Sequence, residues 1–191
     1  MTAPALVLAS ASPRRLALLA QIGIVPDRVV STDIDDAPLH DELPRQHALR
    51  LARAKAASVA TPGCHLLAAD TVVAAGRRIL PKAESEAEAR RCLILLSGRR
   101  HRVMTAVVLH APDGRRGERL VQSVVGFSRL TERQIVHYLA SDEWRGKAGG
   151  YAIQGRAATF IRFLSGSYSN VVGLPLFETA QLLRGLGWPL P

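Results

Sequence analysis

The type of fold follows from one stretch near the start of the chain, Leu6-Val7-Leu8-Ala9-Ser10-Ala11-Ser12-Pro13-Arg14-Arg15. Its first four residues are apolar and end at a Ser/Pro cluster, which predicts a short buried strand. Ser12 followed by Pro13 is typical of a helix start, with Ser at the N-cap and Pro at the first helical position. Apolar residues then continue with helical spacing as far as Gly23. A strand that leads directly into a helix is the unit from which α/β folds are built.

Strands and helices keep alternating along the rest of the chain. Strands are expected at residues 29–31, 65–69, 102–111, 119–129 and 159–164, with a hairpin over 72–79. Further helices are expected to start at Pro44, after Ser85 and after Thr131, and a last helix spans 175–186, with loops at 33–38, 141–150 and 166–173. Both βα and hairpin connections occur, so we expect an α/β fold with a mixed sheet. No linker or repeat interrupts the pattern, which predicts one domain over residues 1–191.

Composition favours a cytoplasmic protein. Of the 191 residues 48% are apolar, and no stretch is long and uncharged enough for a membrane-spanning helix. The first Arg comes only at position 14, after the apolar residues, so the start does not resemble a signal peptide. Cys64 and Cys92 form no CxxC motif, which suits a reducing compartment, and both are expected to be buried.

The formal net charge of +9 indicates a polyanionic partner. Nucleic acid is the first such partner to consider. However, aromatic residues make up only 5% of the chain, which is few for stacking on single strands. A nucleoside triphosphate is a polyanion too, so charge alone does not separate the two.

The first candidate site is the turn from Ser10 to Arg15. A helix N-terminus offers unpaired N–H groups and the positive end of the helix dipole, and two arginines there form a phosphate cradle. The alternative is a capped helix with surface arginines.

Carboxylates form the second group of candidates. Asp70 directly follows an apolar run, and an Asp at the end of a buried strand can hold a metal or act as a general base, or it can simply cap the strand. Asp33, Asp35 and Asp36 lie in one loop, where they are either Mg²⁺ ligands or a solvated acidic turn.

Other polar residues carry weaker signals. Lys55, Lys82 and Lys147 have no local feature that separates them from surface lysines. The segment from Gly149 to Gly155 allows close backbone approach to a ligand, and Gln154 in it is suited to reading a base edge, although a plain loop has the same composition. No GxxxxGK[ST] loop, GxSxG motif or HxxxH pair occurs, which argues against a P-loop enzyme, an α/β-hydrolase and a zinc site.

Taken together, these segments resemble the Maf family over nearly the whole chain. Six segments in the family's order carry the resemblance: 8–15 (LASASPRR), 69–73 (ADTVV), 96–99 (LSGR), 147–151 (KAGGY), 153–155 (IQG) and 166–175 (GSYSNVVGLP). The resemblance implies hydrolysis of a nucleoside triphosphate to the monophosphate and pyrophosphate, with a divalent cation (Mg²⁺ or Mn²⁺) as cofactor. It implies a fold like that of inosine triphosphate pyrophosphatases, an elongated mixed sheet flanked by helices in two lobes with a central cleft. A cytoplasmic homodimer is implied as well.

The resemblance also implies roles for particular residues. Asp70 matches the family's proposed proton acceptor and, with Asp36, is expected to hold the metal. The positions of Arg14, Thr71 and Gln154 match those tied to substrate choice in the branch that acts on dTTP and UTP. The remaining expected substrate-binding residues are Ser10, Ser12, Arg15, Lys55 and Lys82.

Three positions depart from the family's pattern. Asp36 stands where Glu is usual, Pro81-Lys82-Ala83 where Gly-Lys-Pro is common, and Gly146 where Asp is common. Two alternative functions stay open: a pyrophosphatase for a modified purine nucleotide such as 7-methyl-GTP, and a nucleic-acid-binding regulator of division. The sequence supplies no recognition helix or stacking motif for the second, so nucleic acid is the less favoured partner.

Overall fold

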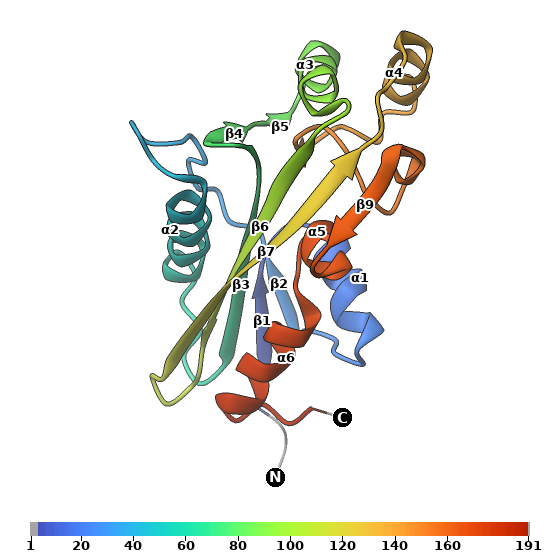
Figure 1. Ribbon diagram of the computed structural model, residues 1–191. Helices are drawn as coiled ribbons and strands as arrows, with labels where there is room; N and C mark the ends of the chain where they lie inside the picture. The colour runs from blue at the N-terminus through green and yellow to red at the C-terminus, as the bar shows by residue number, and fades with distance from the viewer. Residues whose placement is uncertain (1–3, 191) are drawn as a thin grey trace.

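The computed structural model describes residues 4–190, in which helices cover a long twisted sheet (Figure 1). The strands are β1 (Leu6–Ala9), β2 (Arg28–Val30), β3 (His65–Ala75), β4 (Arg78–Leu80), β5 (Lys82–Ala83), β6 (Arg100–His110), β7 (Arg116–Phe127), β8 (Lys147–Ala148) and β9 (Ile161–Ser165). The helices are α1 (Pro13–Gln21), α2 (Pro44–Ala57), α3 (Glu86–Leu96), α4 (Glu132–Leu139), α5 (Tyr168–Val172) and α6 (Leu176–Gly185), with a 3₁₀ turn over Arg156–Phe160.

The main sheet is mixed, as the sequence predicted. Its strands run in the order β2-β1-β3-β6-β7-β9, and β4 pairs with the far end of β3. β1 is parallel to both β2 and β3, whereas the pairs β3–β6, β6–β7 and β7–β9 are antiparallel. The β6–β7 hairpin is the longest element, and its turn lies at Pro112-Asp113-Gly114, where the sequence predicts it. β5 and β8 form a separate two-stranded ribbon.

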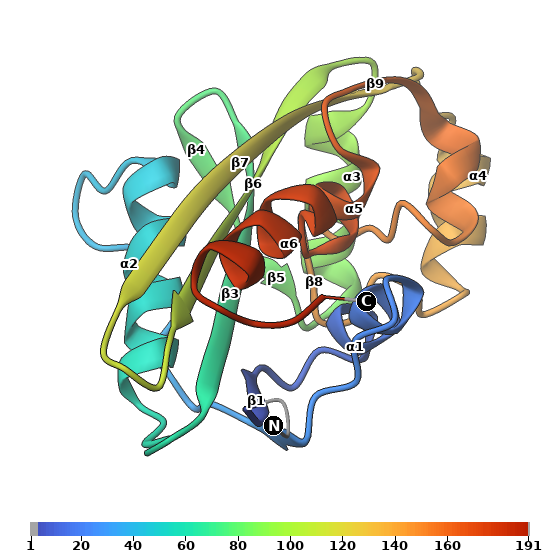
Figure 2. The ribbon, with the colours of Figure 1, turned by 90° about the horizontal axis from the view of Figure 1, so that it is seen from below.

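Successive side chains of β1 pack on opposite faces of the sheet. Leu6 and Leu8 belong to a core cluster that includes Leu18 and Leu19 of α1, whereas Val7 and Ala9 pack in a second cluster with the alanines of α2. Successive side chains of a strand point to opposite faces, so helices are needed on both sides. Figure 2 shows this arrangement, with α2 on one side of β3 and α1 on the other. Helices α3 and α4 lie at the end of the sheet that is far from α6 (Figure 1).

Three sequence predictions need correction. The strand that starts at His65 does not end at Ala69 but continues as β3 to Ala75, because β6 pairs with it along its whole length, including Asp70 opposite Ala106. The segment 166–173 is not a loop throughout, since it contains the short helix α5, whose N-cap Ser167 accepts a hydrogen bond from the Asn170 amide. The predicted loop 141–150 contains β8.

Boundaries and burial also differ in places. The predicted strand 159–164 starts later, as β9, because the 3₁₀ turn takes up its first two residues. Cys92 is buried as expected, but Cys64 is only partly buried.

Candidate active site

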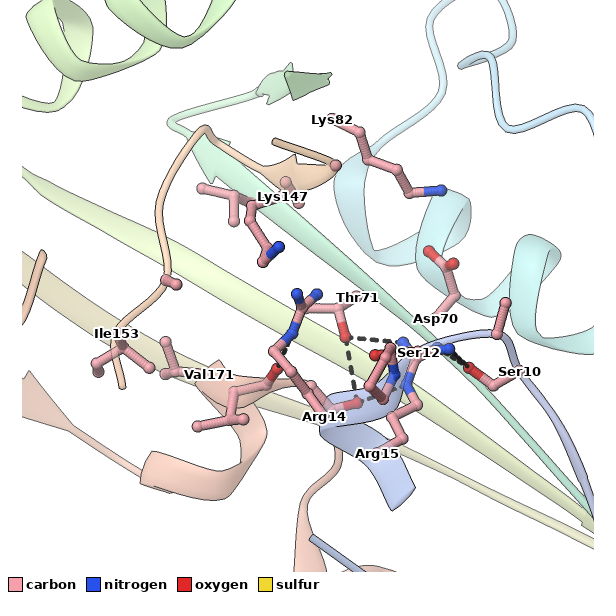
Figure 3. A pocket seen from close by; sticks show the side chains of 18 of the residues that line it. Ser10, Ser12, Arg14, Arg15, Asp70, Thr71, Lys82, Lys147, Ile153 and Val171 are labelled. Carbon is pink, nitrogen blue, oxygen red and sulfur yellow. Dashed lines mark hydrogen bonds between the residues drawn. The ribbon is translucent and has the colours of Figure 1, made fainter. Parts of the chain in front are cut away.

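A cavity of about 360 Å³ opens where β1 ends and α1 begins (Figure 3). Elements far apart in the sequence line it together: the β1–α1 turn, the middle of β3, α2, the β5–β8 ribbon and α5. Its lining includes all the predicted substrate-binding residues and the predicted proton acceptor: Ser10, Ser12, Arg14, Arg15, Lys55, Asp70, Thr71, Lys82 and Gln154. Asp36 lies outside this lining.

The register of the sheet explains where Asp70 lies. The parallel pairing of β1 with β3 stops at Ala9 opposite Ala68, because the chain turns away at Ser10 to start α1. β3 runs on, so Asp70 lies two residues beyond the last pair with β1, at a point of β3 where β6 pairs with one edge and β4 has not yet joined the other. The prediction that a strand ends before Asp70 is wrong, and Asp70 lines the cavity because β1 stops short of it.

Asp70 is held by a buried ion pair with α2. Lys55 Nζ donates to Asp70 Oδ1 at 2.5 Å, and the two residues are only 9% and 2% exposed. Burial lowers the pKa of the Lys55 ammonium, and the Asp70 carboxylate opposes that shift. Asp70 Oδ2 is buried and has no hydrogen-bond partner among residues 4–190. One oxygen of the carboxylate is thus fixed, while the other keeps an unused hydrogen-bond acceptor.

Arg15 is the most enclosed cation of the cavity. Its Nε donates to the Gly173 carbonyl at 2.8 Å, its Nη1 to Ser10 Oγ at 2.8 Å and its Nη2 to Thr71 Oγ1 at 3.2 Å. A guanidinium has five N–H groups, so two remain for a ligand. Burial lowers the pKa of Arg15, and the charge of Asp70 opposes the shift. The side chain stays charged, because Arg does not lose its proton in proteins.

The two serines of the β1–α1 turn differ in their hydrogen bonds. Ser12 occupies the N-cap position of α1, but its side chain makes no capping hydrogen bond. Ser10 Oγ instead accepts from the Ser12 amide at 3.3 Å as well as from Arg15. The helix start therefore leaves the Ser12 hydroxyl available at the cavity wall. Next to it, Arg14 Nε donates to the Val172 carbonyl at 3.3 Å.

Asp36 and Lys82 form a second, more exposed ion pair at the mouth of the site. Their side chains are 47% and 41% exposed, and the hydrogen bond from Lys82 lowers the pKa of the Asp36 carboxyl. Asp36 lines an adjoining cavity that shares Asp70, Thr71 and Lys82 with the main one. Asp33 and Asp35 line neither cavity.

A divalent cation fits these donors only together with a substrate. Among residues 4–190 no three His, Cys, Asp or Glu side chains gather as a metal site. Mg²⁺, however, is commonly bound by one or two carboxylates plus substrate phosphates. The unpartnered Oδ2 of Asp70 and the nearby carboxylate of Asp36 are donors of that kind.

Lys147, which the sequence analysis named without expecting it to bind substrate, also lines the cavity. It lies on β8 opposite Ala83 of β5, so the ribbon brings it next to Lys82. Its Nζ donates to the Arg145 carbonyl at 2.8 Å, and burial and then the charge of Arg14 lower its pKa. The residue-by-residue pattern held no signal for this role, because pairing between β5 and β8 joins segments more than sixty positions apart.

The charge distribution of the cavity suits a polyanion with an apolar end. Asp70 contributes a carboxylate among the cavity's described lining residues. Five cationic side chains line the cavity as well, those of Arg14, Arg15, Lys55, Lys82 and Lys147. Tyr151, Ile153 and Val171 add apolar lining, with Ile153 near Val171 of α5 (Figure 3), and the exposed Gln154 adds an amide. None of the helices within residues 4–190 is long and apolar enough to cross a membrane.

Comparison with known proteins shows to which family the chain belongs. The family model described as "Maf-like protein" matches residues 5–186. A protein of Caulobacter vibrioides named dTTP/UTP pyrophosphatase is 64% identical, with 97% of each chain covered. One of Granulibacter bethesdensis with the same name is 63% identical over 98% of this chain and 95% of its own. Among solved structures, the Staphylococcus aureus Ham1 protein aligns with 64% of this chain and 71% of its own, at 16% identity and a TM-score of 0.43.

Proposed function

Because this chain belongs to the Maf-like protein family, we propose that it is a nucleoside triphosphate pyrophosphatase that hydrolyses dTTP and UTP to the monophosphate and pyrophosphate. Relatives that share more than 60% of their residues with it over nearly their whole length carry the name dTTP/UTP pyrophosphatase. The match spans both the cationic turn and the carboxylate that the reaction needs.

One observation carries the proposal. A buried carboxylate, with one oxygen fixed by Lys55 and the other without a partner among the described residues, lies in a cavity lined by five cations. The cations supply binding for a triphosphate, and the helix start at Ser12 adds the positive end of a dipole. The carboxylate is a base for a water molecule next to the bound phosphates.

In this reaction Asp70 Oδ2 accepts a proton from water as the water oxygen attacks the α-phosphorus. The new P–O bond forms while the anhydride bond between the α- and β-phosphates breaks, and pyrophosphate leaves with that oxygen. Lys55 keeps the carboxylate oriented through Oδ1. Such phosphoryl chemistry depends mainly on positioning and charge stabilisation, which Arg14, Lys82 and Lys147 provide around the phosphates.

A divalent cation, when bound, would be held by Asp70 and Asp36 together with phosphate oxygens and would neutralise part of their charge. The two carboxylates that line the adjoining cavity support this proposed metal site. Gln154 and the apolar side chains near α5 form the end of the cavity where we expect the base. The homodimer implied by the family resemblance is likewise a proposal, and light scattering of the purified chain measures it.

A nucleotide panel scored by pyrophosphate release tests the proposal. Purified protein is incubated with dTTP, UTP, 7-methyl-GTP and ATP, each with Mg²⁺ or Mn²⁺. Preferred release from dTTP and UTP is the expected result. Preference for 7-methyl-GTP would move the assignment to the modified purine, and release of orthophosphate alone would contradict a pyrophosphatase. Tight, salt-dependent binding of duplex DNA without hydrolysis would favour the regulator instead.

A further inference from the structure

A chain of hydrogen bonds leads from the cavity into the sheet behind Arg15. Thr71 lies on β3 directly opposite Thr105 on β6, and their hydroxyl oxygens are 2.9 Å apart. Thr105 is fully buried and does not line the cavity. Its Oγ1 also lies 3.0 Å from the Asn170 carbonyl oxygen.

The direction of these bonds follows from the number of protons. A carbonyl only accepts, so the single hydroxyl proton of Thr105 goes to Asn170. The bond between the two threonines then requires Thr71 as its donor. Thr71 has no proton left for the Gly173 carbonyl at 3.4 Å, and its oxygen can only accept from Arg15. The chain therefore runs from Arg15 to Thr71, to Thr105 and to the Asn170 carbonyl.

The far end of the chain is anchored in the sheet. Asn170 Nδ2 donates to the Val103 carbonyl at 3.1 Å and to Ser123 Oγ at 2.9 Å. Ser123 Oγ in turn donates to the Ser167 carbonyl at 3.1 Å. The same segment carries the Gly173 carbonyl that accepts from Arg15 Nε. Two of the three supports of the Arg15 guanidinium, the Gly173 carbonyl and Thr71, thus depend on the segment 167–173 being fixed to β6 and β7.

We propose that Thr105 is a positioning residue of the phosphate site, which orients the Thr71 hydroxyl as an acceptor for Arg15 and so fixes the two remaining N–H groups of Arg15 toward the substrate. The proposal rests on the proposed function, since it assumes that Arg15 binds a phosphate. It also gives Thr71 a supporting role, because its only proton is used inside the protein.

Substitution by an isosteric apolar residue tests this role. Thr105→Val removes both hydrogen bonds of the hydroxyl, and we expect kcat/KM for dTTP to fall about tenfold, the upper end of the loss typical of one neutral hydrogen bond. Thr105→Ser keeps the hydroxyl and should stay within about twofold of the wild type. Thr179→Val is the matched control, since Thr179 is equally buried and its hydroxyl has no partner among the described residues.

A double-mutant cycle separates positioning from general destabilisation. If Thr105 acts through Arg15, Thr105→Val should cost less than about twofold in an Arg15→Lys background. An unchanged tenfold loss in that background, or normal activity of Thr105→Val alone, would overturn the proposal. Circular dichroism and thermal melts check that each variant is folded, and Thr105→Ala replaces Thr105→Val if the latter does not fold.

Failure of the proposed function would show separately. If the wild type released no pyrophosphate from dTTP or UTP, the hydrolase proposal would fail. Thr105 would then be judged from binding of inorganic tripolyphosphate, which needs no turnover. About tenfold weaker binding by Thr105→Val would support the positioning role, and equal affinity would contradict it.

Discussion

Replacing Asp70 with Asn should damage both turnover and stability, and the structure sets the size of each effect. Asn keeps the shape and an oxygen acceptor for Lys55, but it has no charge and is a poor base. A general base typically contributes about 10²–10⁴-fold to a rate, so kcat should fall by about that factor. Substrate should still bind, because the cations that line the cavity are unchanged.

The stability effect comes from the partner that Asp70 leaves behind. Lys55 is 9% exposed, and its ammonium would lie buried near Arg15 without a counter-charge. Removing one partner of a buried ion pair costs about 3–5 kcal/mol. For a chain of this size each kcal/mol shifts Tm by about 2–4 °C, so the variant should melt roughly 6–20 °C lower. Tripolyphosphate should recover part of this loss, because it supplies negative charge to the same cations.

Asp36→Asn is the matched control for stability. It breaks a second Asp–Lys pair, but one whose side chains are 47% and 41% exposed. Exposed pairs contribute about 0–1 kcal/mol, so Tm should fall by less than about 4 °C. Steady-state kinetics and calorimetry of both variants give the answer. Near-normal turnover of Asp70→Asn, or equal loss of Tm in the two variants, would refute this account of the site.

Three further predictions concern a cation of the cavity, the metal and an ion pair away from the cavity. Lys147→Ala should raise the KM for dTTP about tenfold, since it removes one cation from the phosphate-binding wall, whereas Arg145→Ala, two positions away and outside the cavity, should leave KM unchanged; steady-state kinetics compare them. EDTA should abolish pyrophosphate release and Mg²⁺ or Mn²⁺ should restore it, while Tm without nucleotide stays constant, because no cluster of three or more metal-ligating side chains occurs in residues 4–190; activity that survives EDTA would remove the metal from the proposal. Hydrogen bonds from Arg50 lower the pKa of Glu42 from 4.5 to about 2. The stability that the ionised Glu42 contributes is therefore present above pH 4.5 and is lost as pH falls toward 2. The free energy of unfolding in urea, measured against pH, should show this loss in the wild type and not in Glu42→Gln.

Local sequence rules predicted the elements around the site well. Ser12 and Pro13 mark the start of α1, and capping boxes at Ser85 and Thr131 mark α3 and α4. These signals succeed because a helix start depends on a few neighbouring residues. The same rules missed α5, which is too short to show a helical period.

Long-range pairing explains what the sequence did not predict. Asp70 interrupts an apolar run, so a strand end was expected there, but pairing with β6 carries the strand through it. Lys147 gained its place only through the β5–β8 ribbon. Likewise, the Arg15 guanidinium is held by a carbonyl 158 positions away, which no local pattern indicates.

Hydrolysis in ¹⁸O-labelled water tests the central claim most directly. If Asp70 directs water onto the α-phosphorus of dTTP, mass spectrometry should find the label in dTMP and none in the released pyrophosphate. Label in pyrophosphate would mean attack at the β-phosphorus and would contradict the geometry proposed for Asp70.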